Sequence, residues 1–592
     1  MTSFYVSTPI YYVNGSPHIG HAYTTIAADT LARYHRLLGH DVFFMTGTDE
    51  HGLKVQRAAE KQGVTPQQLA DENSQKFKDL FDRFNITYDR YIRTTEAEHT
   101  RVVQELYNRM LANDDIYLDK YEGWYAAADE AFYDESEIQD GKSIETGADV
   151  EWVEEESYFF RLSKFQEPLL KWYKENPDCI RPESRYNEVV SFVEGGLQDL
   201  SISRTTFDWG IPVPNDPKHV LYVWVDALTN YITGVGAFSD DENWEKFWPC
   251  NLHILGKDIL RFHAVYWPAF LLSGGVELPE QLFIHGWWLV EGEKMSKRAG
   301  NWLDPHQLAD QYALDLLRYY MLREIPFGND GNFANERVIA RNNAELADNF
   351  GNLVNRTTRM VESFVQGEIK KGQSNQDDAA LEKKASDTIK EVHRAMDARE
   401  FHKALEAILS LSSELNLYLH NNQPWKLKKD ETQIDRLNHV LYQTIEGIRW
   451  VATLLLPFVP DAANKVLDAF QVDTAFDSAE HARSFASLEW GALPDGHTIT
   501  SPEVLFAKLE LPASEEEEKK KPSKKAQKKQ EAKEEKKEKP KHIKFQDFEA
   551  VELRVGKVLE ASQVEGSDKL LLLKVDVGEE DRRWHVAGIG WP

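Results

Sequence analysis

The feature that most constrains the fold is an alternation of strand-like and helix-like runs at the start of the chain. Residues 4–13 are apolar, β-branched or aromatic, which is typical of a buried strand. Turn formers occupy residues 14–20, and residues 21–38 then carry apolar side chains at helical spacing. Residues 41–46 form a second strand-like run. This βαβ pattern predicts an α/β fold with a doubly wound, Rossmann-like parallel sheet and helices on both faces.

Later runs divide the 592 residues into several parts. Strand-like runs at 220–225, 252–255 and 282–285 extend the α/β pattern, and an acidic, aromatic stretch interrupts it. We predict an α/β domain in two halves (1–113 and 219–334), an inserted subdomain (114–218), an all-α domain (335–510), a charged flexible linker (511–541) and a partial β tail (542–592).

A first candidate phosphate site lies where the first strand turns into its helix. His18, Gly20 and His21 fall in the sequence His-Ile-Gly-His at this point. The first N–H groups of a helix lack partners and the helix dipole is positive there, so the position favours an anion. Imidazoles can donate to phosphate oxygens, and Gly20 has no side chain to block a nucleotide base. On its own this tetrapeptide is more often an ordinary loop.

A second candidate site is the basic sequence Lys294-Met-Ser-Lys-Arg298, which follows the strand-like run at 282–285. Three cations within five residues, close to Gly292 and Gly300, suit a polyphosphate. An isolated basic pentapeptide is more often a solvated turn. Both motifs on one doubly wound pattern, with an insertion between them, are much more specific.

Net charge and hydropathy exclude some classes of function. The net charge of −29 argues against coating nucleic acid through bulk charge, although residues 519–544 hold thirteen lysines and only four glutamates. No run approaches the roughly 18 apolar residues of a membrane span. The N-terminus resembles neither a signal peptide nor a transit peptide. We therefore expect no membrane partner and a cytoplasmic location.

Cysteine usage bears on metal binding. The two cysteines, Cys179 and Cys250, are far apart in sequence and are most simply reduced thiols. A cysteine-based zinc site needs two or more cysteines at short spacing, so zinc is not expected and no metal-ligating residue is assigned. A site made of histidines and carboxylates remains open.

The two motifs resemble the signatures of the class I aminoacyl-tRNA synthetases, His-Ile-Gly-His and Lys-Met-Ser-Lys-Ser. Arg298 departs from the final serine and leaves the loop cationic. The resemblance implies attack of an amino-acid carboxylate on the α-phosphate of ATP, with Mg²⁺ present. It implies His18, His21, Lys294 and Lys297 as catalytic residues, with Gly20, Ser296 and Arg298 as further ATP contacts.

Within this class the chain most resembles the methionyl-tRNA synthetases, through residues 9–15, 47–52, 223–227 and 256–259. The resemblance implies activation of methionine to methionyl-adenylate and transfer to tRNA(Met). Asp49 would then bind the substrate's α-ammonium group. The implied pocket for the methionine side chain comprises Ile10, Tyr12, Trp224, Ala227, Leu228, Tyr231, Ile259 and His263. A polarizable thioether suits such aromatic walls and one weak hydrogen bond from Tyr12 or His263.

The inserted stretch distinguishes the chain from other members of the class. The editing enzymes for leucine, isoleucine and valine need a hydrolytic domain, for which 114–218 is too short, and a cysteinyl enzyme would bring zinc-binding cysteines. Many methionyl enzymes carry Cys-x-x-Cys knuckles here, whereas residues 123–133 contain no cysteine. The chain therefore resembles a zinc-free branch, whose insertion must be held together by aromatic packing.

The C-terminal half carries the implied tRNA contacts. By resemblance, the all-α domain binds the anticodon through Asn352, Arg356 and Trp425. Asn352 and Arg356 are four residues apart, so they share a helix face, and Trp425 can stack on an unpaired base. The tail from residue 543 resembles an OB-fold tRNA-binding domain cut off half way. If this tail folds, two copies would pair in a homodimer.

Two other functions remain in competition with tRNA charging. A smaller nucleotidylyltransferase would share the two phosphate motifs, but it needs no helical RNA-reading half. A non-catalytic tRNA-binding protein descended from a synthetase need not keep His18, His21, Asp49, Lys294 and Lys297, all of which are present. Amino-acid-dependent exchange of pyrophosphate into ATP separates these readings.

Truncation after Leu511 tests the role of the tail. The lysine-rich tract should aid tRNA binding through counterion release, which depends steeply on salt. We expect the truncated chain to lose tRNA affinity in filter binding at low salt only, with adenylate formation unchanged. A loss that persists at high salt would instead show that the tail folds and reads tRNA specifically.

Overall fold

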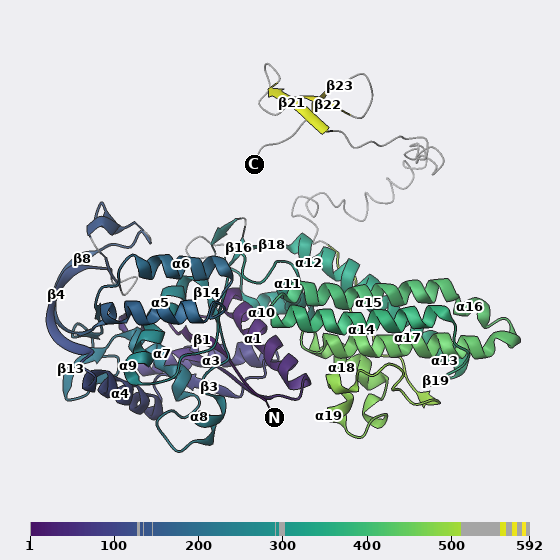
Figure 1. The fold of residues 1–592 in the computed structure, drawn as a ribbon, viewed down its shortest axis with the longest axis horizontal. Coiled ribbons are helices and arrows are strands. Elements are labelled where there is room, and N and C mark those ends of the chain that lie inside the picture. Colours follow the sequence, from purple (N-terminus) through teal and green to yellow (C-terminus); the bar gives the residue numbers. More distant parts are fainter. Residues whose placement is uncertain are drawn as a thin grey trace, which may run out of the picture. The chain divides into compact units, whose positions relative to one another are not determined.

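The computed structural model describes residues 2–126, 131–133, 135–144, 146–290, 292–294, 302–510, 557–563, 571–576 and 583–587. The chain divides into two compact units, Met1–Leu511 and Pro512–Pro592, and each is described by itself (Figure 1). Within the first unit, an α/β part is followed by a part made almost wholly of helices.

A six-stranded parallel sheet forms the centre of the α/β part, in the order β3-β2-β1-β14-β15-β9. Its strands are β1 (Ser3–Tyr12), β2 (Asp41–Asp49), β3 (Arg90–Arg93), β9 (Ile180–Arg181), β14 (Leu252–Gly256) and β15 (Leu282–His285). The strand order reverses direction between β1 and β14, so the sheet is doubly wound with its switch point there. The predicted fold class is confirmed.

Four of the predicted strands are present, at 4–13, 41–46, 252–255 and 282–285. The prediction for 220–225 is wrong beyond Leu221. Strand β13 (Asp216–Leu221) belongs to a small antiparallel sheet, and helix α7 (Val223–Thr233) begins two residues later. A short apolar run can be a strand or a buried helix, and periodicity alone does not separate the two.

Both faces of the sheet are buried, as the apolar run of β1 requires. Phe4 and Val6 pack into one hydrophobic core, whereas Tyr5 between them packs into another. Helices α1 (Ile19–Leu37) and α11 (Leu314–Arg323) contribute to the first core. Helices α4 (Ala97–Ala112), α7 and α9 (Trp267–Gly274) contribute to the second.

The stretch predicted as an insertion contains a four-stranded sheet in the order β10-β8-β4-β5. Its strands are β4 (Ile116–Ala126), β5 (Ala131–Tyr133), β8 (Glu151–Phe160) and β10 (Leu200–Ser201). Helices α5 (Gln166–Glu175) and α6 (Glu183–Glu194) lie between β8 and β10 along the chain. Aromatic pairs cross this sheet: Tyr117 stacks on Phe159 at 5.5 Å, and Trp124 meets Trp152 edge-on at 5.4 Å. Strand β9 also lies in this stretch of sequence but joins the main sheet.

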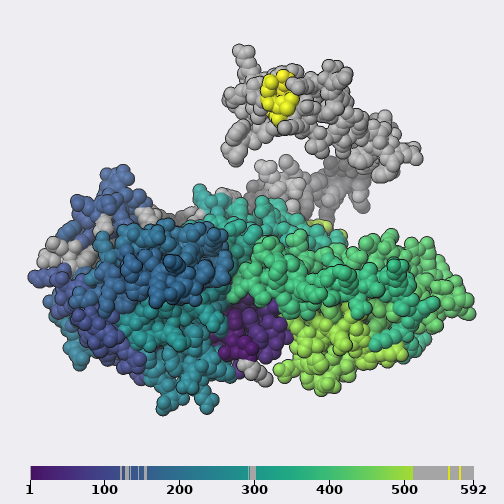
Figure 2. All heavy atoms as spheres, in the orientation of Figure 1, coloured from purple at the N-terminus to yellow at the C-terminus, as the bar shows by residue number. Residues whose placement is uncertain are grey.

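Long helices make up the following part, and three of them lie side by side in Figure 1. These are α14 (Gln376–Asp397), α15 (Phe401–Asn422) and α17 (Ile434–Leu455). The core that covers one face of the sheet continues without a break into this bundle. Figure 2 shows the N-terminal residues, in purple, at the surface between the two parts.

A fully buried ion pair within the α/β part also contacts the helical part. The Asp29 carboxylate on α1 accepts from Arg318 Nη2 of α11 at 2.7 Å, and the side chains of both residues are 0% exposed. Arg318 also donates to the carbonyl groups of Pro457 and Phe458, which follow α17. Burial opposes ionisation of Asp29, but the positive charges of Arg318 and Arg33 outweigh it and lower the pKa of the carboxyl.

The second unit contains three described strands, β21 (Lys557–Gln563), β22 (Leu571–Asp576) and β23 (Arg583–Ala587). They form an antiparallel sheet in chain order. The predicted linker, 511–541, lies outside the described residues. In the part of the chain that the structure describes, no helix is long and apolar enough to cross a membrane.

Arg318→Met should lower the free energy of unfolding by about 3–5 kcal/mol, because it leaves a buried carboxylate without its main partner. The double variant Asp29→Leu/Arg318→Met should recover most of this loss, since it removes both charges. Urea denaturation at pH 7.5 measures the three free energies.

Lys383→Met is the matched control, since its ion pair with Asp387 is exposed and should be worth less than about 1 kcal/mol. If Arg318→Met cost no more than this control, the buried pair would not stabilise the junction.

Candidate active site

Most of the residues predicted to bind methionine and ATP lie at one edge of the main sheet. Tyr12 ends β1, Asp49 ends β2, and Ile259 lies three residues after the end of β14. In an open parallel sheet, ligands bind outside the carboxyl ends of the strands at the switch point, here between β1 and β14. The topology therefore gathers these residues at the place where such a fold binds substrates.

The two motif histidines cap helix α1. Nδ1 of His18 accepts the N–H of Gly20 at 3.1 Å, and Nδ1 of His21 accepts the N–H of His18 at 3.1 Å. The two rings stack at 3.8 Å between centroids. Because each Nδ1 is an acceptor, the neutral form of each ring carries its proton on Nε2, the type of donor that a phosphate oxygen needs.

A buried histidine at the end of β15 contacts the same helix, and sequence reasoning missed it. His285 Nε2 lies 2.8 Å from Thr24 Oγ1, one turn into α1. Its Nδ1 donates to the Gly286 carbonyl at 2.7 Å, and burial lowers the pKa of the ring. A neutral His285 thus links α1 to the strand that precedes the basic loop. Its only signal in the sequence was its place at the end of an apolar run.

The basic loop is described only at its start. Strand β16 (Trp288–Val290) pairs with β17 (Glu293–Lys294), so the backbone of Lys294 is placed. The side chain of Lys294 and the whole of Ser296, Lys297 and Arg298 lie outside the described residues.

Helix α7 carries one wall of the predicted methionine pocket. Its four members are Trp224, Ala227, Leu228 and Tyr231. With about 3.6 residues per turn, these four residues share one face of the helix. The Trp224 ring stacks on Phe262 at 3.8 Å and meets His263 edge-on at 6.1 Å.

A chain of hydrogen bonds fixes the proton on His263. Nδ1 donates to the Ile259 carbonyl at 2.9 Å, so Nε2 accepts from the Tyr231 hydroxyl at 2.7 Å. Burial lowers the pKa of His263 to about 4, so the ring is neutral at pH 7. His263 lies in a π-helical segment, Phe262–Tyr266, a distortion that is frequent at functional sites.

The remaining pocket residues come from β1 and β2. Tyr12 and Asp49 are direct neighbours across these strands, and Ile10 lies two residues earlier on β1. The Asp49 side chain is buried. Tyr12 donates its hydroxyl proton to the His51 carbonyl at 3.0 Å. Because the protons of Tyr12 and His263 are both engaged here, the predicted hydrogen bond to a thioether would require one of these contacts to open.

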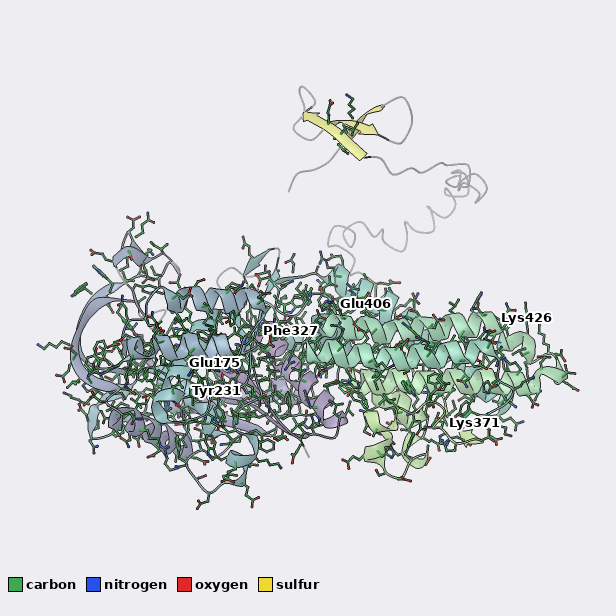
Figure 3. All side chains as sticks on the ribbon, in the orientation of Figure 1. Glu175, Tyr231, Phe327, Lys371, Glu406 and Lys426 are labelled. Carbon is green, nitrogen blue, oxygen red and sulfur yellow. The ribbon has the colours of Figure 1, made fainter. Side chains whose placement is uncertain are left out.

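The predicted anticodon residues lie in the helical part. Asn352 and Arg356 are both on α13 (Asn352–Val365), and Arg356 Nη2 donates to Asn416 Oδ1 at 3.0 Å. Trp425 is 37% exposed on the short helix α16 (Pro424–Leu427). Its neighbour Lys426 lies at the end of the first unit remote from Tyr231 (Figure 3), so the two predicted sites are far apart.

Two buried carboxylates, Glu50 and Asp226, lie in the quoted motifs but were not predicted to have a role. Glu50 accepts two hydrogen bonds from Arg93, at 2.7 and 2.9 Å, and one from Thr95 at 2.6 Å. Asp226 accepts from two histidines. Only Asp226 had a signal in the sequence, as an acidic residue between two apolar ones, since a buried charge is rare unless it is paired.

Profiles of three protein families match the chain. The family described as "tRNA synthetases class I (M)" matches residues 4–141 and 133–358. The "Anticodon binding domain of methionyl tRNA ligase" matches 369–526, and a "Putative tRNA binding domain" matches 553–590. Together with the doubly wound sheet and the capped histidine motif, these matches define a class I aminoacyl-tRNA synthetase.

Comparison with individual proteins shows the family within this class. A methionine–tRNA ligase of Caldanaerobacter subterraneus is 45% identical over 99% of this chain and 90% of its own length. One from Rickettsia conorii is 48% identical over 86% and 99%. Mycobacterium tuberculosis methionyl-tRNA synthetase in complex with methionyl-adenylate superposes with a TM-score of 0.82 at 48% identity, over 86% of this chain and 100% of the other. The chain belongs to the methionyl-tRNA synthetase family.

Neutral His263 should make the fold sensitive to acid. Its pKa is about 4 in the folded protein against 6.5 ordinarily, so its contribution is full above pH 6.5 and is lost as the pH falls toward 4. Between pH 7 and pH 5 this costs about 2 kcal/mol of unfolding free energy. His263→Gln should therefore lose about 2 kcal/mol less than the wild type over this range, as measured by urea denaturation.

His420→Gln, at an exposed position on α15, is the control. An equal pH dependence in His263→Gln and the wild type would mean that His263 titrates normally.

Proposed function

We propose that this protein activates methionine with ATP, giving methionyl-adenylate and pyrophosphate, and then transfers methionine to tRNA(Met). The proposal rests on one observation: the histidine-capped helix α1, Asp49 and the aromatic pocket lie together at the switch point of the sheet. Membership of the methionyl-tRNA synthetase family supports the identity of the substrates.

The α1 side of the site would bind ATP. The Nε2 atoms of His18 and His21 would donate to oxygens around the α-phosphate, where charge grows as the methionine carboxylate attacks. Gly20 supports this role, since a Cβ there would lie 2.9 Å from the His18 ring and would displace it. Lys294, Ser296, Lys297 and Arg298 would bind the leaving pyrophosphate.

The other side would bind methionine. Asp49 would accept the α-ammonium group in a charge-assisted bond, and its burial would strengthen this contact. The thioether would extend between Trp224 and the Tyr231–His263 pair. The other predicted members, Ile10, Tyr12, Ala227, Leu228 and Ile259, would complete the apolar wall.

The described side chains indicate which metals the enzyme would need. No group of three or more metal-binding side chains occurs among the described residues. Mg²⁺ would therefore be held mainly by the ATP phosphates, where it neutralises charge on the leaving group. We propose that the enzyme needs no zinc, because the two buried cysteines lie in separate loops, before β9 and before β14, and the insertion offers aromatic packing in place of a metal knuckle.

The parts of the chain would divide the work on tRNA. Residues 335–510 would read the anticodon through Asn352, Arg356 and Trp425, while 1–113 and 219–334 perform the chemistry around the connective insertion, 114–218. The linker, 511–541, and the tail, 542–592, would add nonspecific affinity. Two copies would pair in a homodimer only if the tail folds. We place the reaction in the cytoplasm.

ATP–pyrophosphate exchange tests the proposal. Methionine alone among the protein amino acids should support rapid exchange. Asp49→Ala should raise the KM for methionine roughly a hundredfold, because it removes a buried charge-assisted bond. The KM for ATP should change little.

Asp387→Ala, on the exposed surface of α14, should behave like the wild type in both measurements. Comparable exchange with leucine or cysteine would contradict the pocket assignment. An unchanged KM for methionine in Asp49→Ala would contradict the ammonium role. Tight tRNA binding without any exchange would favour the non-catalytic alternative, and amino-acid-independent exchange would favour a nucleotidylyltransferase.

A further inference from the structure

One buried carboxylate joins three elements behind the predicted methionine pocket. Asp226 Oδ2 lies 2.7 Å from His51 Nδ1, in the turn after β2, and Oδ1 lies 2.8 Å from His99 Nε2 on α4. The side chains of Asp226 and His99 are 1% and 0% exposed, so water does not compete for these contacts. His99 Nδ1 in turn lies 3.0 Å from Thr233 Oγ1, at the end of α7.

Helix geometry places this carboxylate opposite the pocket. Asp226 immediately precedes Ala227, yet at about 3.6 residues per turn it points away from the face that holds the pocket residues of α7. The same inner face carries Thr233, two turns further on, which also contacts His99. Helix α7 is therefore held from behind, at its first turn and at its last, by one histidine of α4.

The second histidine ties this cluster to the substrate-binding edge of β2. His51 lies two residues after Asp49, and its ring packs edge-on against Trp209 at 5.3 Å. Trp209 Nε1 donates to the Glu50 carbonyl at 2.6 Å, so the turn that begins at Asp49 is held on two sides. The link from Asp49 to α7 thus runs through His51 and Asp226.

The charges in the cluster favour a fixed geometry. Burial opposes ionisation of Asp226, but the His51 charge and hydrogen bonds from both rings outweigh it and lower the pKa of the carboxyl to about 2. Burial likewise opposes protonation of His51, while Asp226 outweighs it and raises the pKa of the ring. A buried, paired carboxylate is poor at adding stability over an apolar replacement, but it fixes the positions of its donors.

We infer that Asp226 is a positioning residue for methionine: through His51 and His99 it sets the span between Asp49 and the pocket face of α7. This inference rests on the proposed function, in which Asp49 holds the ammonium group and α7 walls the thioether. A span that is fixed at both ends selects the length of an unbranched side chain. Loss of the clamp should weaken methionine binding and length discrimination together, and leave ATP binding intact.

Asp226→Asn and His99→Leu test the inference in the full-length protein by ATP–pyrophosphate exchange. In asparagine an NH₂ donor replaces one of the two oxygens that accept from the rings. Leucine at position 99 removes the fully buried ring that donates to Asp226. Each variant should raise the KM for methionine roughly ten- to hundredfold, with the KM for ATP changed less than about twofold. The preference in kcat/KM for methionine over ethionine, which is one methylene longer, should fall at least about fivefold.

Two further variants separate positioning from general destabilisation. His99→Gln keeps an N–H donor near the place of Nε2 and should recover most of the methionine affinity. His439→Leu removes a buried histidine 3.2 Å from Asp378 in the helical part and should leave both KM values unchanged. Thermal denaturation of all four variants checks that they fold. If Asp226→Asn does not fold, the comparison of His99→Leu with His99→Gln tests the inference.

The outcomes are distinct. An active wild type with unchanged methionine KM in His99→Leu, or equal losses for methionine and ATP, would overturn the positioning role alone. Failure of His99→Gln to recover affinity would do the same. A wild type without methionine-dependent exchange would overturn the proposed function and this inference with it.

Discussion

The buried pair of Asp29 and Arg318 is the contact on which the arrangement of the first unit depends. Asp29 accepts from Arg318, from Arg33 and from both the N–H and the hydroxyl of Thr87, so its carboxylate has a full set of donors away from water. A buried ion pair is favourable only when the two groups keep their hydrogen-bonding geometry, because neither partner can turn to solvent. It therefore fixes α1 with respect to α11 and the end of α17.

Helix α1 transmits this constraint in both directions. Its first residues present the two capping histidines at the switch point of the sheet. Near its other end, the Tyr34 hydroxyl lies 2.7 Å from Nδ1 of His393 on α14. A helix is stiff over this length, and the same apolar core surrounds both ends. The helical part thus helps to set the orientation of the phosphate-binding end, although it contributes no residue to the candidate active site.

The sequence predicted those features that lie close together along the chain. The strands at 41–46 and 282–285 are apolar runs with clear turn signals, and the histidine motif is four consecutive residues. The helix that begins at Val223 was missed because its first residues are as apolar as the preceding strand, and only the partners of Asp226 show which face is inner. His99 lies 127 positions from Asp226 in sequence, so nothing local could reveal their contact. Family resemblance supplied the pocket residues, whereas composition and periodicity supplied the fold class.

The pKa values of two buried histidines in the candidate site shift in opposite directions, and burial alone does not decide the direction. His263 and His51 are both buried, but only His51 is hydrogen-bonded to a carboxylate. The pKa of His51 therefore rises, while that of His263 falls to about 4. The proposed substrate is charged at its α-carbon and neutral along its side chain. Acidic groups gather at the Asp49 end, where an ammonium group would bind. At the other end the neutral His263 ring is hydrogen-bonded to Tyr231. A thioether there would contact uncharged groups. Charge is thus separated along the direction in which methionine would lie.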